Sequence, residues 1–165
     1  SSENACNLLG VSSVIKFNFP DNKMDVIPLL DIVKKIESQI LNISPTIVYT
    51  HHIGDLNIDH QITHKAVMTA CRPQPNFCIK EIYSFEVLSS TEWQTPVVTP
   101  FTPNVFIDIS KYSKIKIEAL KAYGEEMNQP PHSRSIANIM CLSSLRGNSI
   151  GVNYAEAFTL IRMIR

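Results

Sequence analysis

Four histidines and two aspartates fall within the fourteen residues "HHIGDLNIDHQITH" (51–64). Histidine and aspartate side chains bind metal ions and transfer protons, so chemistry is most expected in this histidine loop. It follows "PTIVYT" (45–50), a nearly apolar stretch typical of a strand buried on both faces, and it runs into a helix predicted from Ile58 to Cys71. The spacing of the side chains distinguishes three kinds of site.

A calcium loop is the first kind. Asp55, Asn57 and Asp59 stand at the first, third and fifth positions that an EF-hand loop uses. The sixth position is His60, where a glycine is needed, and the twelfth is Ala66, where a bidentate glutamate is needed. The spacing therefore disfavours calcium.

A zincin helix is the second kind, because His60 and His64 are four residues apart and would share one helix face. Gln61 follows His60, so the general-base glutamate of the H-E-x-x-H motif is absent. The remaining alternative is a loop at the carboxyl end of a strand that contributes one or two ligands and a carboxylate to a shared site.

Composition describes an ordinary folded chain. Hydrophobic residues make up 44% of the 165 positions and charged residues 18%, which predicts one compact domain spanning 1–165. Fifteen basic and fifteen acidic residues balance, so the sequence shows no electrostatic footprint for nucleic acid or an anionic membrane surface. The cysteines form no C-x-x-C pair, which favours reduced, mostly buried thiols in a cytoplasmic protein. No apolar run is long enough for a membrane span.

Strand and helix patterns alternate along the chain, which predicts an α/β domain with a mainly parallel sheet. Besides the two elements named above, the patterns predict strands at 13–19, 77–88 and 104–109, and helices at 25–40, 113–127 and 135–147. Residues 90–104 contain three prolines and predict a surface loop. The opening residues read as the end of a helix, so we expect the first strand of the domain to be missing.

Several segments together resemble the LmbE/PIG-L-type zinc-dependent N-acetylglucosaminyl deacetylases, in particular their bacterial branch. "YTHHIGDLNIDHQITHKAV" is similar to the second metal motif of that family. The likeness continues through "NACNLLGV", "FPDNKMD", "NVFIDISKYSKIKIEALKAYGEEM", "PPHSRS" and "RGNSIGVNYAEAFTLIR", in the family's order. The resemblance implies a three-layer Rossmann-like fold and zinc-dependent removal of an acetyl group from an N-acetylated amino sugar or its conjugate.

The resemblance also implies roles for individual residues. His60 matches the family's third zinc ligand, and Asp59 beside it would orient an imidazole. Asn57 replaces a histidine that stabilises the reaction intermediate in several relatives, so the catalytic donor is expected to be Asn57 itself, His51 or His52, with His52 preferred. The family's His-Pro-Asp-Asp motif, which supplies two further ligands and the general base, is absent from this sequence and is expected upstream of Ser1.

"PPHSRS" (130–135) is the second stretch with candidate binding residues. Arg134 could hold a sugar hydroxyl or a phosphate, and His132 could face the site. Arg134 could equally pair with a carboxylate such as Glu125 or Glu156 to fix the loop. We therefore assign both residues to substrate binding with a structural role left open.

Two other functions stay open at this stage. One is a noncatalytic carbohydrate-binding or assembly module that keeps the fold without the metal site. The other is a nucleotide-binding protein, although no glycine-rich phosphate loop is found among the five glycines. The sequence does not distinguish a monomer from a homo-oligomer, and it does not identify the amino sugar.

Overall fold

The computed structural model describes residues 2–124 and 126–165, which fold as two compact units. Unit 1 comprises residues 2–16 and 106–157, and unit 2 comprises residues 17–105 and 158–165. The chain therefore passes between the units three times, after Lys16, Val105 and Ala157. The histidine loop lies wholly within unit 2.

Unit 2 is built on the parallel pair β1 (Ile47–His51) and β2 (Glu81–Phe85). Ile47 lies opposite Glu81 and His51 opposite Phe85, so both strands end at the same edge. β4 (Ala155–Met163) runs antiparallel beside β2, and the sheet order is β1-β2-β4-β3, with β3 at Val105–Asp108. The α/β class is confirmed, with a mixed four-stranded sheet.

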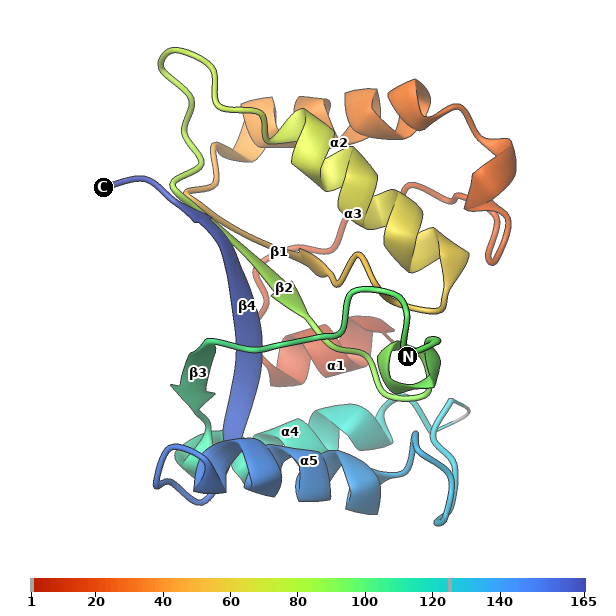
Figure 1. Cartoon of the computed structure of the whole chain (residues 1–165), viewed down its shortest axis with the longest axis vertical. Coiled ribbons are helices and arrows are strands. Elements are labelled where there is room, and N and C mark those ends of the chain that lie inside the picture. The colour runs from red at the N-terminus through yellow and green to blue at the C-terminus, as the bar shows by residue number, and fades with distance from the viewer. Residues whose placement is uncertain (1, 125) are drawn as a thin grey trace. The chain divides into compact units, whose positions relative to one another are not determined.

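Helices α2 (Leu29–Ile43) and α3 (Ile58–Ala70) pack against each other beside β1 and β2 (Figure 1). The core between these elements is apolar and nearly closed to solvent. It contains Ile32, Val33, Ile40, Ala66, Val67, Ala70, Cys71, Ile79 and Ile82. Burial of this cluster fixes the face that α3 turns to the sheet, and hence the position of its first turn.

Unit 1 contains α1 (Ser2–Leu8), α4 (Ser113–Lys121) and α5 (Ile136–Asn148). α1 packs against α4, and Lys116 of α4 forms a 2.6 Å ion pair with Glu156 of β4. Gly147 near the end of α5 lies so close to the backbone of the following turn that an added Cβ would stand 2.7 Å from the Val152 carbonyl oxygen. That approach explains why a glycine occupies the position.

The predicted strand at 13–19 is wrong, since the structure assigns no strand there. Val14 and Ile15 are 43% and 48% exposed, and Asn18 adopts a positive φ of 54°, which interrupts an extended chain. The same segment crosses from one unit to the other after Lys16. β-branched residues alone do not make a strand without a partner to pair with.

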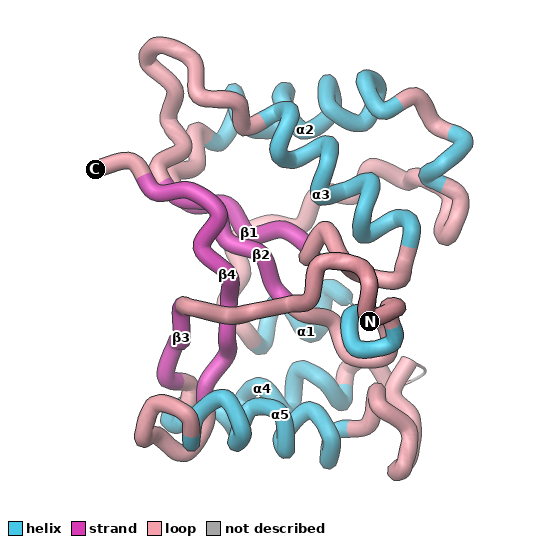
Figure 2. Tube along the Cα trace, viewed as in Figure 1, coloured by secondary structure: helices cyan, strands magenta, loops and turns pink. Residues whose placement is uncertain are grey.

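The other predicted elements are present with shifted bounds. The helix expected from Asp25 begins at Leu29, after the short 3₁₀ turn Met24–Val26, because Pro28 disfavours helical backbone at Ile27. The helix expected to begin at Ile58 begins there. The long connection between β2 and β3 is mostly irregular (Figure 2) and contains the 3₁₀ turn Thr91–Trp93. Another 3₁₀ turn, Ser110–Tyr112, precedes α4.

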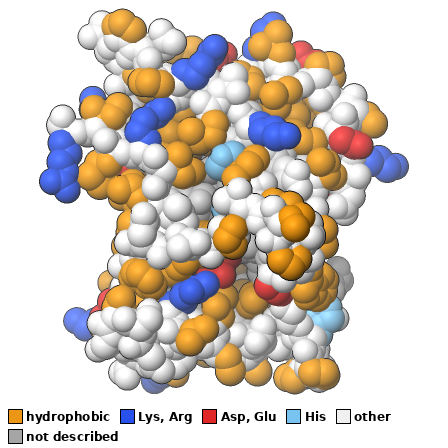
Figure 3. Space-filling view, in the orientation of Figure 1, with side chains coloured by type: hydrophobic (Ala, Val, Ile, Leu, Met, Phe, Trp, Pro, Cys, Tyr) orange, Lys and Arg blue, Asp and Glu red, His pale blue; other side chains and the backbone are white. Residues whose placement is uncertain are grey.

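Two surface features bear on partners. No helix in the described residues has the length and apolarity needed to cross a membrane. On the face drawn in Figure 3, basic and acidic side chains are interspersed, without a block of one sign. The even distribution agrees with the balanced charge of the sequence.

Candidate active site

His60 lies in the first turn of α3, and Asn57 fixes where that turn begins. Asn57 is the N-cap: its side-chain oxygen accepts hydrogen bonds from the backbone N–H groups of Asp59 (2.8 Å) and His60 (3.4 Å). Its amide nitrogen donates to the Asn22 side chain at 3.2 Å. Both ends of the Asn57 amide are thus used in holding the loop, and Asn22 engages one of the two N–H donors of its NH2 group.

Asp55 is the carboxylate nearest to His60. Its side chain is fully buried, and its Oδ1 lies 3.0 Å from Nδ1 of His60, close but not aligned as a hydrogen bond. Asp55 accepts hydrogen bonds from the Ser90 hydroxyl, the Thr91 hydroxyl (2.6 Å) and the Asn57 N–H (2.8 Å). One carboxylate therefore joins the histidine loop to the segment after β2.

The ionisation of Asp55 follows from these contacts. Burial alone would raise the pKa of Asp55, but His60, the two hydroxyls and the Asn57 N–H favour the charged form. Together these groups hold the pKa well below its usual range. Asp55 is consequently a fixed negative charge beside the His60 imidazole.

His51 stacks on His60 at the end of β1. The ring centroids are 4.1 Å apart and the ring planes are 17° from parallel. Burial and the neighbouring His60 imidazole lower the pKa of His51 to about 4, with Asp55 acting in the opposite direction. His64, one turn after His60, places its Nδ1 2.8 Å from the His51 carbonyl oxygen, and burial lowers its pKa as well.

His52 faces a different neighbour. Its Nε2 lies 2.9 Å from the Thr99 carbonyl oxygen, and its ring forms a T-shaped pair with the Phe101 ring, with the centroids 5.4 Å apart. Gly54 makes this contact possible, since an added Cβ would stand 2.1 Å from the same Thr99 oxygen and 2.7 Å from Nε2 of His52. His52, the residue that the sequence analysis prefers as the catalytic donor, therefore anchors residues 99–101 through its Nε2.

Asp59 also points away from the imidazoles. Its carboxylate accepts the backbone N–H groups of Asn22 (2.7 Å) and Met24 (3.0 Å). These bonds tie the start of α3 to the turn before α2. Asp55, not Asp59, is the carboxylate found beside the His60 imidazole, and the orienting role of Asp59 stays a prediction.

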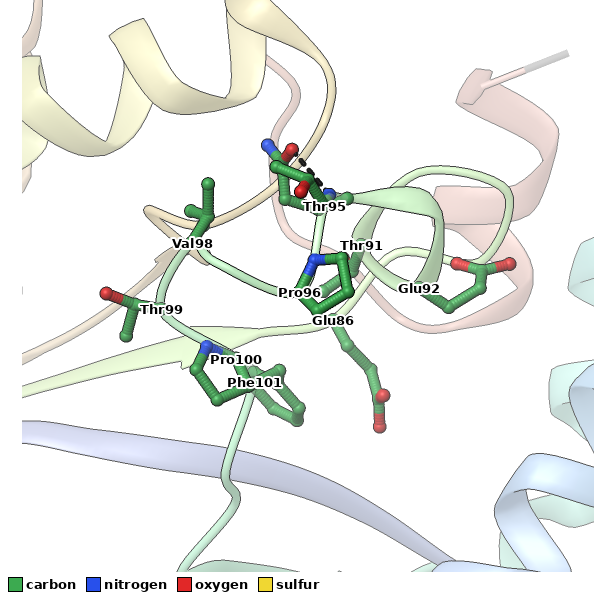
Figure 4. Close-up of a pocket in the computed structure, with 11 residues that line it drawn as sticks. Glu86, Thr91, Glu92, Thr95, Pro96, Val98, Thr99, Pro100 and Phe101 are labelled. Atoms are coloured by element: carbon green, nitrogen blue, oxygen red, sulfur yellow. Dashed lines mark hydrogen bonds between the residues drawn. The ribbon is translucent and has the colours of Figure 1, made fainter.

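A cavity of about 270 Å³ opens beside the histidine loop in unit 2. Figure 4 shows Thr91, Pro96, Pro100 and Phe101 around it, all from the connection after β2. Gly54, Glu86, Glu92, Gln94, Thr95, Val98 and Thr99 complete the lining. Thr91 lines the cavity and its hydroxyl also donates a hydrogen bond to Asp55. The position of the cavity wall is therefore linked to that of the carboxylate beside His60.

His132 and Arg134 lie in unit 1. Nδ1 of His132 accepts the Arg134 backbone N–H at 2.9 Å, and Ser135 caps α5 through its hydroxyl. Glu156 pairs with Lys116, and Glu125 lies outside the described residues. The structure thus gives His132 a turn-forming contact, and the substrate role of both residues stays a prediction.

His60, the zinc ligand that the resemblance implies, has a geometry that suits a metal. Asp55 faces Nδ1 of His60, which leaves Nε2 as the metal-binding nitrogen, and the side chain is 21% exposed. A catalytic zinc site needs about three protein ligands, whereas no group of three histidine, cysteine, aspartate or glutamate side chains suited to a metal occurs in residues 2–124 and 126–165. His60 fits the metal, and the described part of the chain does not complete its coordination.

Comparison with known families tests the resemblance noted in the sequence. Residues 2–71 match the family model of PIG-L, GlcNAc-PI de-N-acetylase. The resemblance to the PIG-L family is confirmed. The PIG-L match ends at Cys71, so it includes α3 and the whole histidine loop with His60.

Solved structures resemble this chain in fold over nearly its whole length. The conserved protein TT1542 from Thermus thermophilus superposes with a TM-score of 0.76 at 18% identity, covering 99% of this chain and 72% of that protein. The N,N'-diacetylchitobiose deacetylase from Pyrococcus horikoshii gives 0.74 at 17%, covering 97% and 61%. The A40926 pseudoaglycone deacetylase Dbv21 gives 0.63 at 20%, covering 98% and 68%. These similarities establish the shared fold.

Proposed function

We propose that the protein containing this chain is a zinc-dependent hydrolase that removes an acetyl group from an N-acetylated amino sugar or its conjugate. The observation that carries the proposal is His60, held at the start of α3 with Asp55 beside its Nδ1 and its Nε2 left for a metal. The PIG-L match over the histidine loop supports this assignment. Several proteins with the same fold are deacetylases by their names.

Zinc, when bound, would polarise the acetyl carbonyl and activate a water molecule. The residues of this chain contribute orientation. Asp55 fixes the direction of the His60 ring, and its hydrogen bonds to Ser90 and Thr91 hold the cavity wall at a set distance from that ring. Since Asp55 accepts at least three hydrogen bonds and is buried, it serves as a positioning residue rather than a base.

We further propose that the remaining zinc ligands and the general base come from residues outside the sequence printed above. This part of the proposal is supported by the lack, among the described residues, of any group of three histidine, cysteine, aspartate or glutamate side chains that could hold a metal ion. One solved structure with a similar fold is described as the zinc-inhibited form of teicoplanin deacetylase Orf2, at 17% identity and a TM-score of 0.62. We also propose that His52 anchors residues 99–101 and that Asn57 caps α3, in place of the catalytic roles that the sequence predicts for them.

The test uses the full-length protein. It is loaded with zinc and incubated with a panel of N-acetylglucosaminyl compounds, and the free amine released is measured. We expect amine release by the wild-type protein, and loss of both activity and tight zinc binding in His60→Ala. A fully zinc-loaded protein that releases no amine from any compound would contradict the enzyme proposal and favour a noncatalytic carbohydrate-binding module.

A further inference from the structure

Among the described residues, His51 is the imidazole in direct ring contact with His60. It is the last residue of β1, opposite Phe85 at the end of β2. Its ring contacts two others: His60 at 4.1 Å in a near-parallel stack, and Phe85 at 4.9 Å with the planes tilted by 54°. A strand end thus presents a flat surface to the ring that we assign to zinc.

The backbone of His51 is held by the same helix. Nδ1 of His64 donates to the His51 carbonyl oxygen at 2.8 Å, and His64 lies one turn after His60 on α3. α3 therefore contacts the end of β1 at two points: His60 stacks on the His51 ring, and His64 donates a hydrogen bond to the His51 carbonyl oxygen. This double contact fixes the distance between the rings of His51 and His60.

Hydrogen bonding by the ring does not explain why a histidine occupies position 51. Nδ1 is buried and has no hydrogen-bond partner in the described part of the chain. An unpaired buried polar atom costs about 1–3 kcal/mol, so this nitrogen opposes folding. The ring contact is the favourable part of the arrangement.

We propose that His51 is a positioning residue that fixes the plane of the His60 imidazole. Asp55 sets the rotation of that imidazole within its plane by facing Nδ1. His51 limits the tilt of the plane by lying against one face. With both constraints, Nε2 of His60 points in one direction. The inference rests on the proposed function, because it takes His60 as a zinc ligand.

Two substitutions separate the ring of His51 from its nitrogen. His51→Phe keeps a flat ring and removes the buried nitrogen, and His51→Asn keeps a polar group near the position of Nδ1 and removes the ring. Tyr49→Phe is the matched control, because it removes a polar group from the same face of β1 two residues earlier and keeps the stack of residue 49 on Tyr83. All three are made in the full-length protein.

We expect His51→Asn to weaken zinc affinity by about 10-fold or more, in the range measured for residues that orient metal ligands. We expect His51→Phe to stay within about threefold of wild type, since the stack persists. Zinc affinity is measured by competition with a chelator, and thermal unfolding of the zinc-free protein shows whether each variant folds. His51→Phe that folds but loses zinc as His51→Asn does would overturn the proposal, as would unchanged affinity in His51→Asn.

If the larger phenyl ring prevents folding, His51→Leu replaces it as the apolar variant without a polar nitrogen. His51→Leu lacks a flat ring, as His51→Asn does, so it should also weaken zinc affinity by about 10-fold or more, and an affinity within about threefold of wild type would contradict the proposal. Failure of the proposed function looks different. A wild-type protein that neither binds zinc tightly nor releases amine refutes the enzyme assignment, and the inference about His51 fails with it. If the wild-type protein does both, the His51 variants test the inference alone.

Discussion

At the scale of single residues, the site depends most on Asp55, a buried charge with a complete set of partners. Three groups donate to its carboxylate, and the His60 imidazole lies 3.0 Å away. Such a carboxylate is stable in the interior because its partners replace water. Removing the charge leaves donors of the loop without acceptors.

Asp55→Asn should therefore lower the free energy of unfolding by at least about 1–3 kcal/mol at pH 7. The folded pKa of Asp55 lies far below its unfolded value near 4, so its contribution is present above about pH 4 and is lost as the pH falls toward the folded pKa. The difference between wild type and Asp55→Asn should consequently shrink from pH 6 to pH 3. Urea denaturation at several pH values measures it, and a constant difference would show that the charge of Asp55 is not what stabilises the loop.

At the scale of elements, α3 is the helix that positions the site, and its start is set by a side chain. Asn57 satisfies two N–H groups of the first turn, including that of His60. Without a cap, the first turn frays and the His60 backbone moves with it. A capping role and a catalytic role for Asn57 predict different effects of substitution at this position.

Asn57→Ala should reduce the free energy of unfolding by about 0.5–2 kcal/mol, whereas Asn57→Ser retains a capping oxygen and should lose only a small part of that. In the full-length protein, Asn57→Ser should keep most of the amine release expected under the proposed function. A serine variant that is as stable as wild type but inactive would return Asn57 to the catalytic group. Denaturation curves and the amine assay are made on the same preparations.

The elements that the sequence predicts well are those whose pattern is local. α3 follows from apolar spacing and a polar residue before it, and β1 from an apolar run. β4 was not predicted, because Ala155, Ala157 and Thr159 alternate too weakly to stand out and its partner β2 is more than seventy residues away. The importance of Asp55 was missed for a related reason: its partners Ser90 and Thr91 are thirty-five and thirty-six residues away.

At the scale of the whole molecule, neither compact unit is a continuous stretch of chain. Unit 2 is completed by residues 158–165, in which Phe158 packs on Tyr49 and Arg162 donates to the Cys71 carbonyl oxygen. The last strand thus closes a unit begun about 140 residues earlier. We therefore expect the folding of unit 2 to require residues 158–165.

Deletion of residues 158–165 should open the core of unit 2. Cys71 reports it, because the thiol is fully buried and burial raises its pKa to about 11, so it should resist a thiol reagent in the intact chain at pH 8. Cys141 is exposed in unit 1 and should react in both forms, which provides an internal reference. Deletion of 164–165 alone is the control. Protection of Cys71 in the longer deletion would show that β4 is dispensable for this core.

Gly54 has a consequence for how the site could change during evolution or in the laboratory. The histidine loop and residues 99–101 touch through a backbone oxygen at a point with no room for a methyl group. Insertions or deletions near Thr99 would therefore shift the backbone at Gly54 and, with it, the neighbouring His52 and Asp55. Substitutions at positions 95–98 would leave this close backbone contact in place. Libraries that aim to alter the compounds accepted by the cavity should vary Thr95, Pro96 and Val98 and leave the length of the segment and position 54 untouched.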